Sequence, residues 1–436
     1  MSPQPNLAER GMSVGLKAIN ALAGSELIDR LGLRQPTERL LHGASKTTMR
    51  TATRAGRTFA AAQKLTKPAR QPRAGRRDLF DLTPDDEQQM LRESVREFAL
   101  AKLRPVAAAA DDACAASPEL LEQANELGLS MVGVPEELGG VIEQRSAVTS
   151  VLLSEALAEG DMGIALACLA PSAVATAIGL WGDADQQSRY LPEFVGESVP
   201  AAALALLEPR ALFNPFELQT TARESNGGYV LDGVKALVPR AADGELFIIA
   251  AELGDQGPSL FIVEAGTDGL QVEPEPAMGL RAAGTGRLIL DGVAGSLMPD
   301  ANYEECVQLA RLGWCAVAVG TGQAVLDYVK DYVNQRTAFG EPVANRQAVA
   351  FTVANIAIEL EGMRLATYRA ASRVDQGLPF AREVALARRL CAERGMQIGS
   401  DGVQLLGGHG YVKEHPVERW YRDLRATGLM EGALLV

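Results

Sequence analysis

The chain of 436 residues is poor in the residue types that build metal sites and disulfide frameworks. It has three histidines and five cysteines, and no two cysteines form a CxxC pair. Disulfide frameworks and zinc sites need such residues in clusters, so we expect neither here. The cysteines stand mostly among Ala, Leu and Val, which predicts small buried side chains.

A long apolar run and a secretory leader are also lacking. Glycine or charge interrupts apolar stretches, such as the one around Val317, before they reach the roughly 20 residues that cross a bilayer. The start, MSPQPNLAERG, lacks the basic and apolar regions of a secretory signal. We therefore expect a cytoplasmic protein without a transmembrane helix. An Arg-rich start also resembles an organellar transit peptide, but Glu9, Glu26 and Asp29 argue against one.

What is present is a globular composition with an uneven distribution of charge. The chain is 47% hydrophobic and 22% charged, enough for a large core in two or three units. Residues 1–80 hold fifteen Lys or Arg and five Asp or Glu, so a total charge of −13 leaves −23 for the rest. Residues 1–77 therefore form a basic extension, either solvated or in peripheral contact with an anionic membrane or a partner. Its lone aromatic, Phe59, argues against nucleic-acid binding.

The hydrophobic period divides the remaining chain into three parts. Residues 78–199 have helical spacing, and Thr83 and Pro84 are candidates for the N-cap and first position of the first helix. Residues 200–300 contain short alternating runs bounded by Gly, Pro or Asp, which predict a barrel-like antiparallel β domain. Residues 301–436 predict an antiparallel four-helix bundle. The expected fold class is a multi-domain α+β protein.

The stretch from Gln404 to Gly432 holds the most specific pattern. Three glycines, at 407, 408 and 410, follow an apolar helical run, and a short amphipathic helix is expected after Pro416. Glu431 lies beyond that helix between apolar residues, so its pKa should be raised and it should suit proton abstraction. Each feature alone also fits a helix C-cap or a solvated glutamate.

Together, the segments QLLGGHGY, EHPVERWYRD and MEG closely resemble the C-terminal signature of the acyl-CoA dehydrogenase family. The segments RPVA, ELGLSMVGVPEELGG, SEALAEGD and QQSRYLPEFVGE resemble the helical N-terminal domain of the same family. The resemblance covers about residues 81–432. It implies FAD as cofactor, α,β-desaturation of an acyl-CoA thioester, and transfer of the electrons to an electron-transferring flavoprotein.

The resemblance also implies roles for residues near the thioester. Glu431 falls at the position of the base that removes the α proton. Some relatives place this base before an arginine on the first bundle helix, but that position here is Ala310, ahead of Arg311. Arg311 and Gly432 fall at substrate positions, although Arg311 also fits an exposed face of an amphipathic helix.

The cofactor positions implied by the resemblance lie on two sides of a subunit interface. Arg336, Phe339 and Gln347 match residues that contact the FAD of the adjacent subunit, and an arginine suits a pyrophosphate. Gln404 and Gly408 match residues that approach the same dinucleotide from the other side. A homodimer or homotetramer is therefore expected, with a heteromer containing a paralogue as the alternative.

Four positions around the flavin ring depart from the family pattern. Leu207 stands where a threonine is common, Leu237 and Pro239 replace a tryptophan and a threonine, and Ala433 replaces a threonine. These changes remove hydrogen-bond donors from the ring site. The alternative interpretation is therefore a catalytically degenerate, non-enzymatic subunit or scaffold of the same fold. Oxidase or monooxygenase chemistry on this fold is a third.

Overall fold

The structure, a computed structural model, describes residues 83–140, 145–196, 198–225 and 227–434. The chain divides into two units, Met1–Leu79 and Phe80–Val436, and every described residue belongs to the second. The predicted basic extension, residues 1–77, and its expected membrane contact lie outside the described residues.

The first part of the described chain is helical, as the spacing predicted. Its helices are α4 (Asp86–Phe98), α5 (Arg104–Ala113), α6 (Pro118–Asn125), α7 (Ala147–Ala158), α8 (Met162–Trp181) and α9 (Ala184–Tyr190). A π-helical turn, Ala99–Leu103, joins α4 to α5. Short 3-10 segments cover Leu129–Gly133, Glu136–Leu138 and Leu191–Val195.

The start of α4 differs from the prediction. Asp85, not Thr83, is the N-cap, because its carboxylate accepts from the Gln88 backbone N–H at 2.8 Å. The Gln88 side chain accepts from the Asp85 backbone N–H in return. This reciprocal capping box satisfies two N-terminal donors, which Thr83 two residues earlier does not do.

Two described helices are longer apolar segments than we expected from the sequence. Helix α8 and helix α10 (Tyr303–Gln335) are long and apolar enough to cross a membrane by length and composition alone. In α8 the glycines lie inside the helix without interrupting it. However, 61% and 67% of their apolar windows are buried within the protein, as in the core helices of a soluble fold.

The middle part is a closed, mostly antiparallel sheet. Its strands are β1 (Ala202–Ala205), β2 (Thr221–Ser225), β3 (Gly228–Val238), β4 (Leu246–Glu252), β5 (Pro258–Glu264), β6 (Leu270–Pro274) and β7 (Gly286–Leu297). Strands β2, β3, β7, β5 and β4 pair in turn, and β4 pairs with β2 to close the ring. The expected barrel-like domain is therefore present. Strand β1 pairs parallel to β4, and the single β2–β4 residue pair is also parallel.

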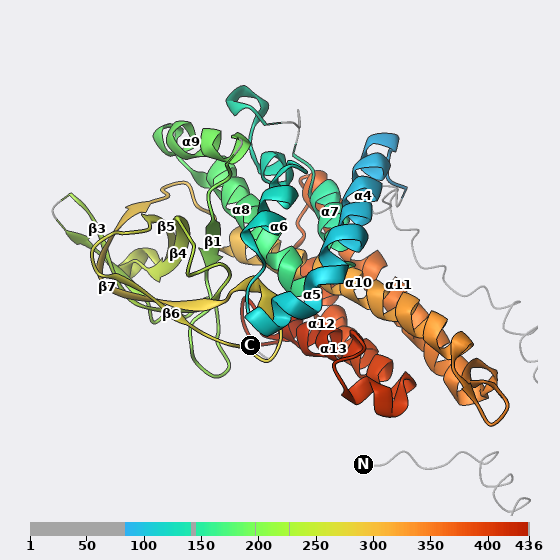
Figure 1. Ribbon diagram of the computed structural model, residues 1–436. Coiled ribbons are helices and arrows are strands. Elements are labelled where there is room, and N and C mark those ends of the chain that lie inside the picture. The colour runs from blue at the N-terminus through green and yellow to red at the C-terminus, as the bar shows by residue number, and fades with distance from the viewer. Residues whose placement is uncertain (1–82, 141–144, 197, 226, 435–436) are drawn as a thin grey trace, which may run out of the picture. The chain divides into compact units, whose positions relative to one another are not determined.

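The last part is the predicted helical bundle. After α10, a small hairpin of β8 (Thr337–Ala338) and β9 (Glu341–Pro342) leads to α11 (Gln347–Asp375), α12 (Ala381–Leu405) and α13 (Val417–Leu424). The fourth helix, α13, is only eight residues long and packs against α12. Figure 1 shows the sheet on the left and the long bundle helices on the right, with α4 to α8 between and above them.

Candidate active site

A cavity of about 230 Å³ is bounded by the helical part, the sheet and the bundle. Helices α7 and α8 form one side, α10 another, and the ends of β1 and β3 a third. The lining is mainly apolar and includes Leu169, Ala173, Leu204, Leu237, Leu309 and Trp314. A mostly apolar cavity with few polar groups is typical of a small-molecule or cofactor site.

Glu431 lines this cavity with only 8% of its surface exposed. Its backbone is left-handed, with φ 53°, and its carboxylate oxygen Oε2 has no hydrogen-bond partner among the described residues. Burial raises the pKa of Glu431 to about 7. The charge of Arg388, a hydrogen bond from Trp314 and the charge of Arg311 act in the opposite direction. A carboxylate with this pKa suits proton transfer near neutral pH.

Two arginines hold the backbone that carries this carboxylate. Arg311 Nε, from α10, donates to the Glu431 carbonyl oxygen at 3.0 Å. Arg388 Nη2, from α12, donates to the carbonyl oxygen of Gly432. Gly432 has φ 107°, and a Cβ there would lie 2.7 Å from Cδ of Pro215, so glycine is required. The structure thus places Arg311 and Gly432 at the base, while their contact with substrate stays a prediction.

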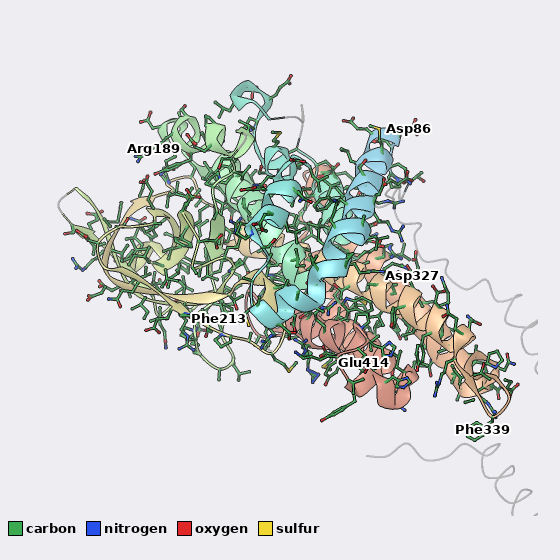
Figure 2. All side chains as sticks on the ribbon, in the orientation of Figure 1. Asp86, Arg189, Phe213, Asp327, Phe339 and Glu414 are labelled. Carbon is green, nitrogen blue, oxygen red and sulfur yellow. The ribbon has the colours of Figure 1, made fainter. Side chains whose placement is uncertain are left out.

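The predicted adenine-side residues lie far from this cavity within one chain. Arg336 and Phe339 lie in the turn between α10 and α11, and Gln347 is the first residue of α11; all three are exposed, Phe339 by 95%. Figure 2 shows Phe339 at the opposite end of the bundle from Phe213, whose carbonyl accepts from the Ala433 backbone N–H beside Glu431.

Gln404 and Gly408 form a second exposed group, at and just after the end of α12. They also lie outside the lining of the cavity. The structure therefore brings neither predicted cofactor group to Glu431 within one subunit.

The sheet side of the cavity is apolar at the positions that depart from the family pattern. Leu207, Leu237 and Pro239 all line it. The backbone N–H of Leu237 already donates to Glu275 Oε2 at 2.7 Å, and a proline has no N–H. This wall therefore offers apolar contact and few donors to a bound ring.

A buried ion pair joins the two chain segments that carry Leu207 and Leu237. Lys235 Nζ lies 3.0 Å from Glu208 Oε1, and their side chains are 0% and 2% exposed. Glu208 also accepts from the backbone N–H groups of Gln219 and Thr220. Burial lowers the pKa of Lys235 to about 8, partly offset by Glu208. Satisfied charges of this kind fix the backbone around them, because losing one partner leaves the other buried and unpaired.

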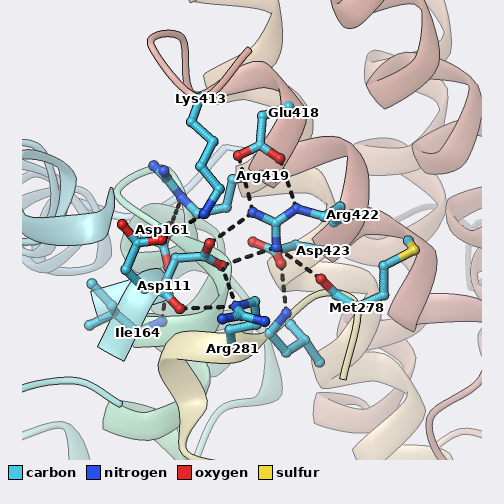
Figure 3. Close-up of polar contacts among 12 residues, drawn as sticks. Asp111, Asp161, Ile164, Met278, Arg281, Lys413, Glu418, Arg419, Arg422 and Asp423 are labelled. Atoms are coloured by element: carbon cyan, nitrogen blue, oxygen red, sulfur yellow. Dashed lines mark hydrogen bonds and ion pairs between the residues drawn. The ribbon is translucent and has the colours of Figure 1, made fainter. Parts of the chain in front are cut away.

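The three parts of the described chain are tied together by a second ionic cluster, drawn in Figure 3. Arg422 of α13 makes two hydrogen bonds to the Asp111 carboxylate of α5, at 3.0 and 2.9 Å. It also donates to the carbonyl of Met278, in the segment between β6 and β7. Arg281, from the same segment, donates to the Asp111 carbonyl at 3.0 Å.

Two further carboxylates in this cluster are fully enclosed. Asp161, the N-cap of α8, is paired with Arg419 at 2.8 Å. Asp423 accepts from the backbone N–H of Leu280 at 2.6 Å, and burial and the charge of Asp161 raise its pKa. The cluster thus fixes α13, and the segment that carries Glu431 follows this helix in the chain.

Comparison with known proteins decides the family. Residues 85–198, 203–293 and 302–434 match models of the N-terminal, middle and C-terminal domains of acyl-CoA dehydrogenases. An acyl-CoA dehydrogenase from Bacillus subtilis (strain 168) is 30% identical over 364 residues, covering 79% of this chain and 94% of that protein. The chain belongs to the acyl-CoA dehydrogenase family.

Two further likenesses agree with this assignment. The mitochondrial short-chain specific acyl-CoA dehydrogenase of Bos taurus is 33% identical over 364 residues, covering 79% of this chain and 86% of that protein. The structure of butyryl-CoA dehydrogenase from Megasphaera elsdenii superposes with a TM-score of 0.76 at 28% identity, covering 82% and 97% of the two chains. The predicted family, fold class, FAD-dependent oxidoreductase class and FAD cofactor of this acyl-CoA dehydrogenase are thereby confirmed.

The cavity of this acyl-CoA dehydrogenase suits the ring of FAD in its apolar character, although it offers the ring few hydrogen-bond donors. Leu207, Leu237 and Trp314 line it, and one buried carboxylate oxygen, Oε2 of Glu431, has no partner among the described residues. An aromatic ring with an acyl group beside it fits such a space.

Sequence reasoning missed Arg388 and a ring cluster near Gly408. Arg388 is spaced with the apolar Val384 and Cys391 on α12, and this pattern was a usable signal for a buried arginine. The ring cluster joins His409 and His415, stacked 5.5 Å apart, to hydroxyls of Tyr332 and Tyr328. It depends on how α10 packs against the segment after α12, which spacing does not reveal.

Proposed function

We propose that this chain desaturates an acyl-CoA thioester between Cα and Cβ, with Glu431 as the acceptor of the α proton. The observation that carries the proposal is a buried, unpartnered carboxylate oxygen, on a group whose pKa is about 7, lining an apolar cavity. Bound FAD would supply the acceptor for the β hydrogen and its electron pair.

The protein's own groups account for the proton step. A thioester α proton is weakly acidic, so a base must lie against it in a site shielded from water. Arg311 and Arg388 hold the carbonyl oxygens of residues 431 and 432, which fixes the left-handed backbone and directs the glutamate. Both guanidiniums also favour the ionised carboxylate, which is the form that accepts the proton.

The cofactor would be held by two subunits. Leu207, Leu237 and Pro239 are proposed to contact the ring from the same chain as Glu431. Arg336, Phe339, Gln347, Gln404 and Gly408, which lie away from the cavity, are proposed to reach the adenine and pyrophosphate end in a neighbouring subunit. This division supports a homodimer or homotetramer, or a heteromer with a paralogue.

The electron acceptor and the location of the enzyme are also proposals. An electron-transferring flavoprotein is proposed as the oxidant of the reduced enzyme, and the cytoplasm as its location. Peripheral membrane contact through residues 1–77 lies outside the described residues.

The test is the absorption spectrum of the purified protein before and after anaerobic addition of acyl-CoAs. A stoichiometric yellow flavin that bleaches supports the proposal. Glu431→Gln should keep the flavin spectrum and abolish bleaching, while Glu414→Gln, at an exposed site, should change neither. Bleaching retained in Glu431→Gln would reject the base assignment.

The same experiment addresses the alternative function. The apolar residues at 207, 237, 239 and 433 favour weak flavin binding, and a colourless protein that takes up no added FAD would support a non-enzymatic subunit or scaffold.

A further inference from the structure

One charged side chain stands out in the cavity lining. Arg145, immediately before the N-cap of α7, lines the same cavity as Glu431 and is half-buried. The other polar residues on the helical side of the lining carry hydroxyls: Ser150, Ser154, Ser172 and Thr176. A guanidinium on a mainly apolar wall loses hydration and gains stability only from an acceptor.

No acceptor is hydrogen-bonded to Arg145 within the described part of the chain. The two carboxylates whose charges act on it, Asp375 and Glu305, are engaged elsewhere. Asp375 accepts from the Ser146 hydroxyl and from the backbone N–H groups of Ala147 and Val148. Glu305 accepts from the Asn302 side-chain amide at 3.2 Å. Burial lowers the pKa of Arg145, and the charges of these two carboxylates oppose that shift without a hydrogen bond to its guanidinium.

Arg145 and Glu431 line the same cavity but are influenced by different charged groups. The cations that influence the pKa of Glu431 are Arg388 and Arg311, and the anions that influence that of Arg145 are Asp375 and Glu305. The same lining includes apolar residues of α8 and α10, among them Leu169, Ala173, Leu309, Ala310 and Gly313. A ligand in the cavity would therefore meet a base, an apolar stretch and a cation.

We propose that the acyl group accepted here carries a second carboxylate at its far end, which pairs with Arg145, so that the substrate is the mono-CoA thioester of an α,ω-dicarboxylic acid. This inference rests on the proposed function. The planar guanidinium makes two parallel, charge-assisted hydrogen bonds to a carboxylate, and the apolar stretch takes the methylene chain. A neutral methyl end would offer the donors of Arg145 no acceptor.

Binding of matched thioesters tests the proposal without turnover. Glu431→Gln protein with FAD supplied is titrated calorimetrically with three pairs of equal carbon number: hexanoyl- and adipoyl-CoA, octanoyl- and suberoyl-CoA, decanoyl- and sebacoyl-CoA. The CoA part is common to each pair, so the ratio of dissociation constants reports the chain end. At least one dicarboxylic member should bind about tenfold more tightly than its partner.

Substitutions of Arg145 test whether this residue causes the preference for dicarboxylic thioesters. Arg145→Met should remove the preference, and Arg145→Lys should retain part of it because the charge stays and the planar fork is lost. Arg223→Met, at an exposed arginine of β2, should leave the ratio unchanged. Equal or weaker binding of every dicarboxylic member overturns the inference, as does a preference that persists in Arg145→Met.

The bleaching experiment tests the proposed desaturation independently of the binding ratio. If no thioester bleaches the flavin of the unsubstituted protein, the desaturation proposal fails, whatever the binding ratio. If monocarboxylic thioesters bleach it and no dicarboxylic member binds more tightly, only the inference about Arg145 fails.

Discussion

Glu431 should give the enzyme a pH dependence centred near neutrality. The base accepts a proton only when ionised, and burial raises its pKa to about 7. We therefore expect kcat/KM to fall about tenfold for each pH unit below 7 and to level off above it. A pH profile measured with one bleaching acyl-CoA checks this, and a flat profile between pH 5 and 8 would contradict it.

The pH dependence of the free energy of unfolding gives an independent measure of the raised pKa of Glu431. A carboxyl whose pKa is raised on folding stabilises the protein below its ordinary pKa of about 4.5 and loses that contribution as pH rises through about 7. Glu431→Gln should therefore gain stability relative to the unsubstituted protein between pH 5 and 9, by on the order of 3 kcal/mol. Urea unfolding of both proteins at pH 5 and at pH 9 measures this difference in stability.

Arg388 is expected to tune this base. Among the groups that lower the pKa of Glu431, its charge has the largest effect, and it also holds the Gly432 carbonyl. Arg388→Met should move the rising limb of the pH profile to higher pH and lower the rate at pH 7. Arg389→Met is the matched control, since Arg389 is 72% exposed and paired with Glu393. A limb that stays in place in Arg388→Met would contradict the assigned role.

Glu431 and Arg388 differ in how far the sequence predicts their surroundings. The burial of Glu431 was predictable because apolar Leu429 and Met430 precede it. Its partner Arg388 was not identified, because arginine is usually exposed and its helical spacing was the only clue. Which carbonyls the arginines hold depends on packing between distant helices.

At the level of elements, the ends of β1 and β3 should limit FAD affinity. Leu207 and Pro239 place no side-chain donor on the sheet wall of the cavity. Leu207→Thr and Pro239→Thr each add a hydroxyl there, and we expect FAD to bind about fivefold more tightly for each bond gained. Quenching of FAD fluorescence measures this. Val272→Thr, at a 40% exposed valine of β6 outside the cavity lining, should have no effect. Unchanged affinity in both cavity variants would show that these walls do not contact the ring.

The elements themselves were largely predictable, and their closure was not. The change of period near residue 200 indicated strands, and the long apolar helices after residue 303 indicated a bundle. The sheet closes through one β2–β4 residue pair, Thr221 with Glu252, and a single pair leaves no pattern in the sequence. The cap of α4 was misplaced by two residues because Thr83, Pro84 and Asp85 are all plausible at a helix start.

For the whole molecule, we expect cofactor loading and assembly to depend on each other. Arg336 lies three residues before Phe339, which Figure 2 shows at the opposite end of the bundle from Phe213, so its proposed contact with FAD requires a second subunit. Arg336→Ala should lower the FAD content per chain and shift the protein toward smaller species, because a charge-assisted contact across the interface is lost. Absorbance ratios and sedimentation velocity measure both. Arg189→Ala, at an exposed arginine on α9, is the control. Full FAD content in Arg336→Ala would argue against the shared site.

The ionic cluster around Asp111 and Arg422 limits how this chain could be recombined with its relatives. Its charges come from the helical part, the segment between β6 and β7, and α13, and the pairs Arg422–Asp111 and Arg419–Asp161 join α13 to the helical part. A chimaera that imports the middle domain alone would have to reproduce Arg281 and the backbone groups at 278 and 280, or leave Asp111, Arg422 and Asp423 with fewer hydrogen-bond partners. Exchange of parts by recombination is therefore constrained at this junction, while substitutions inside the cavity remain free to alter which acyl group is accepted.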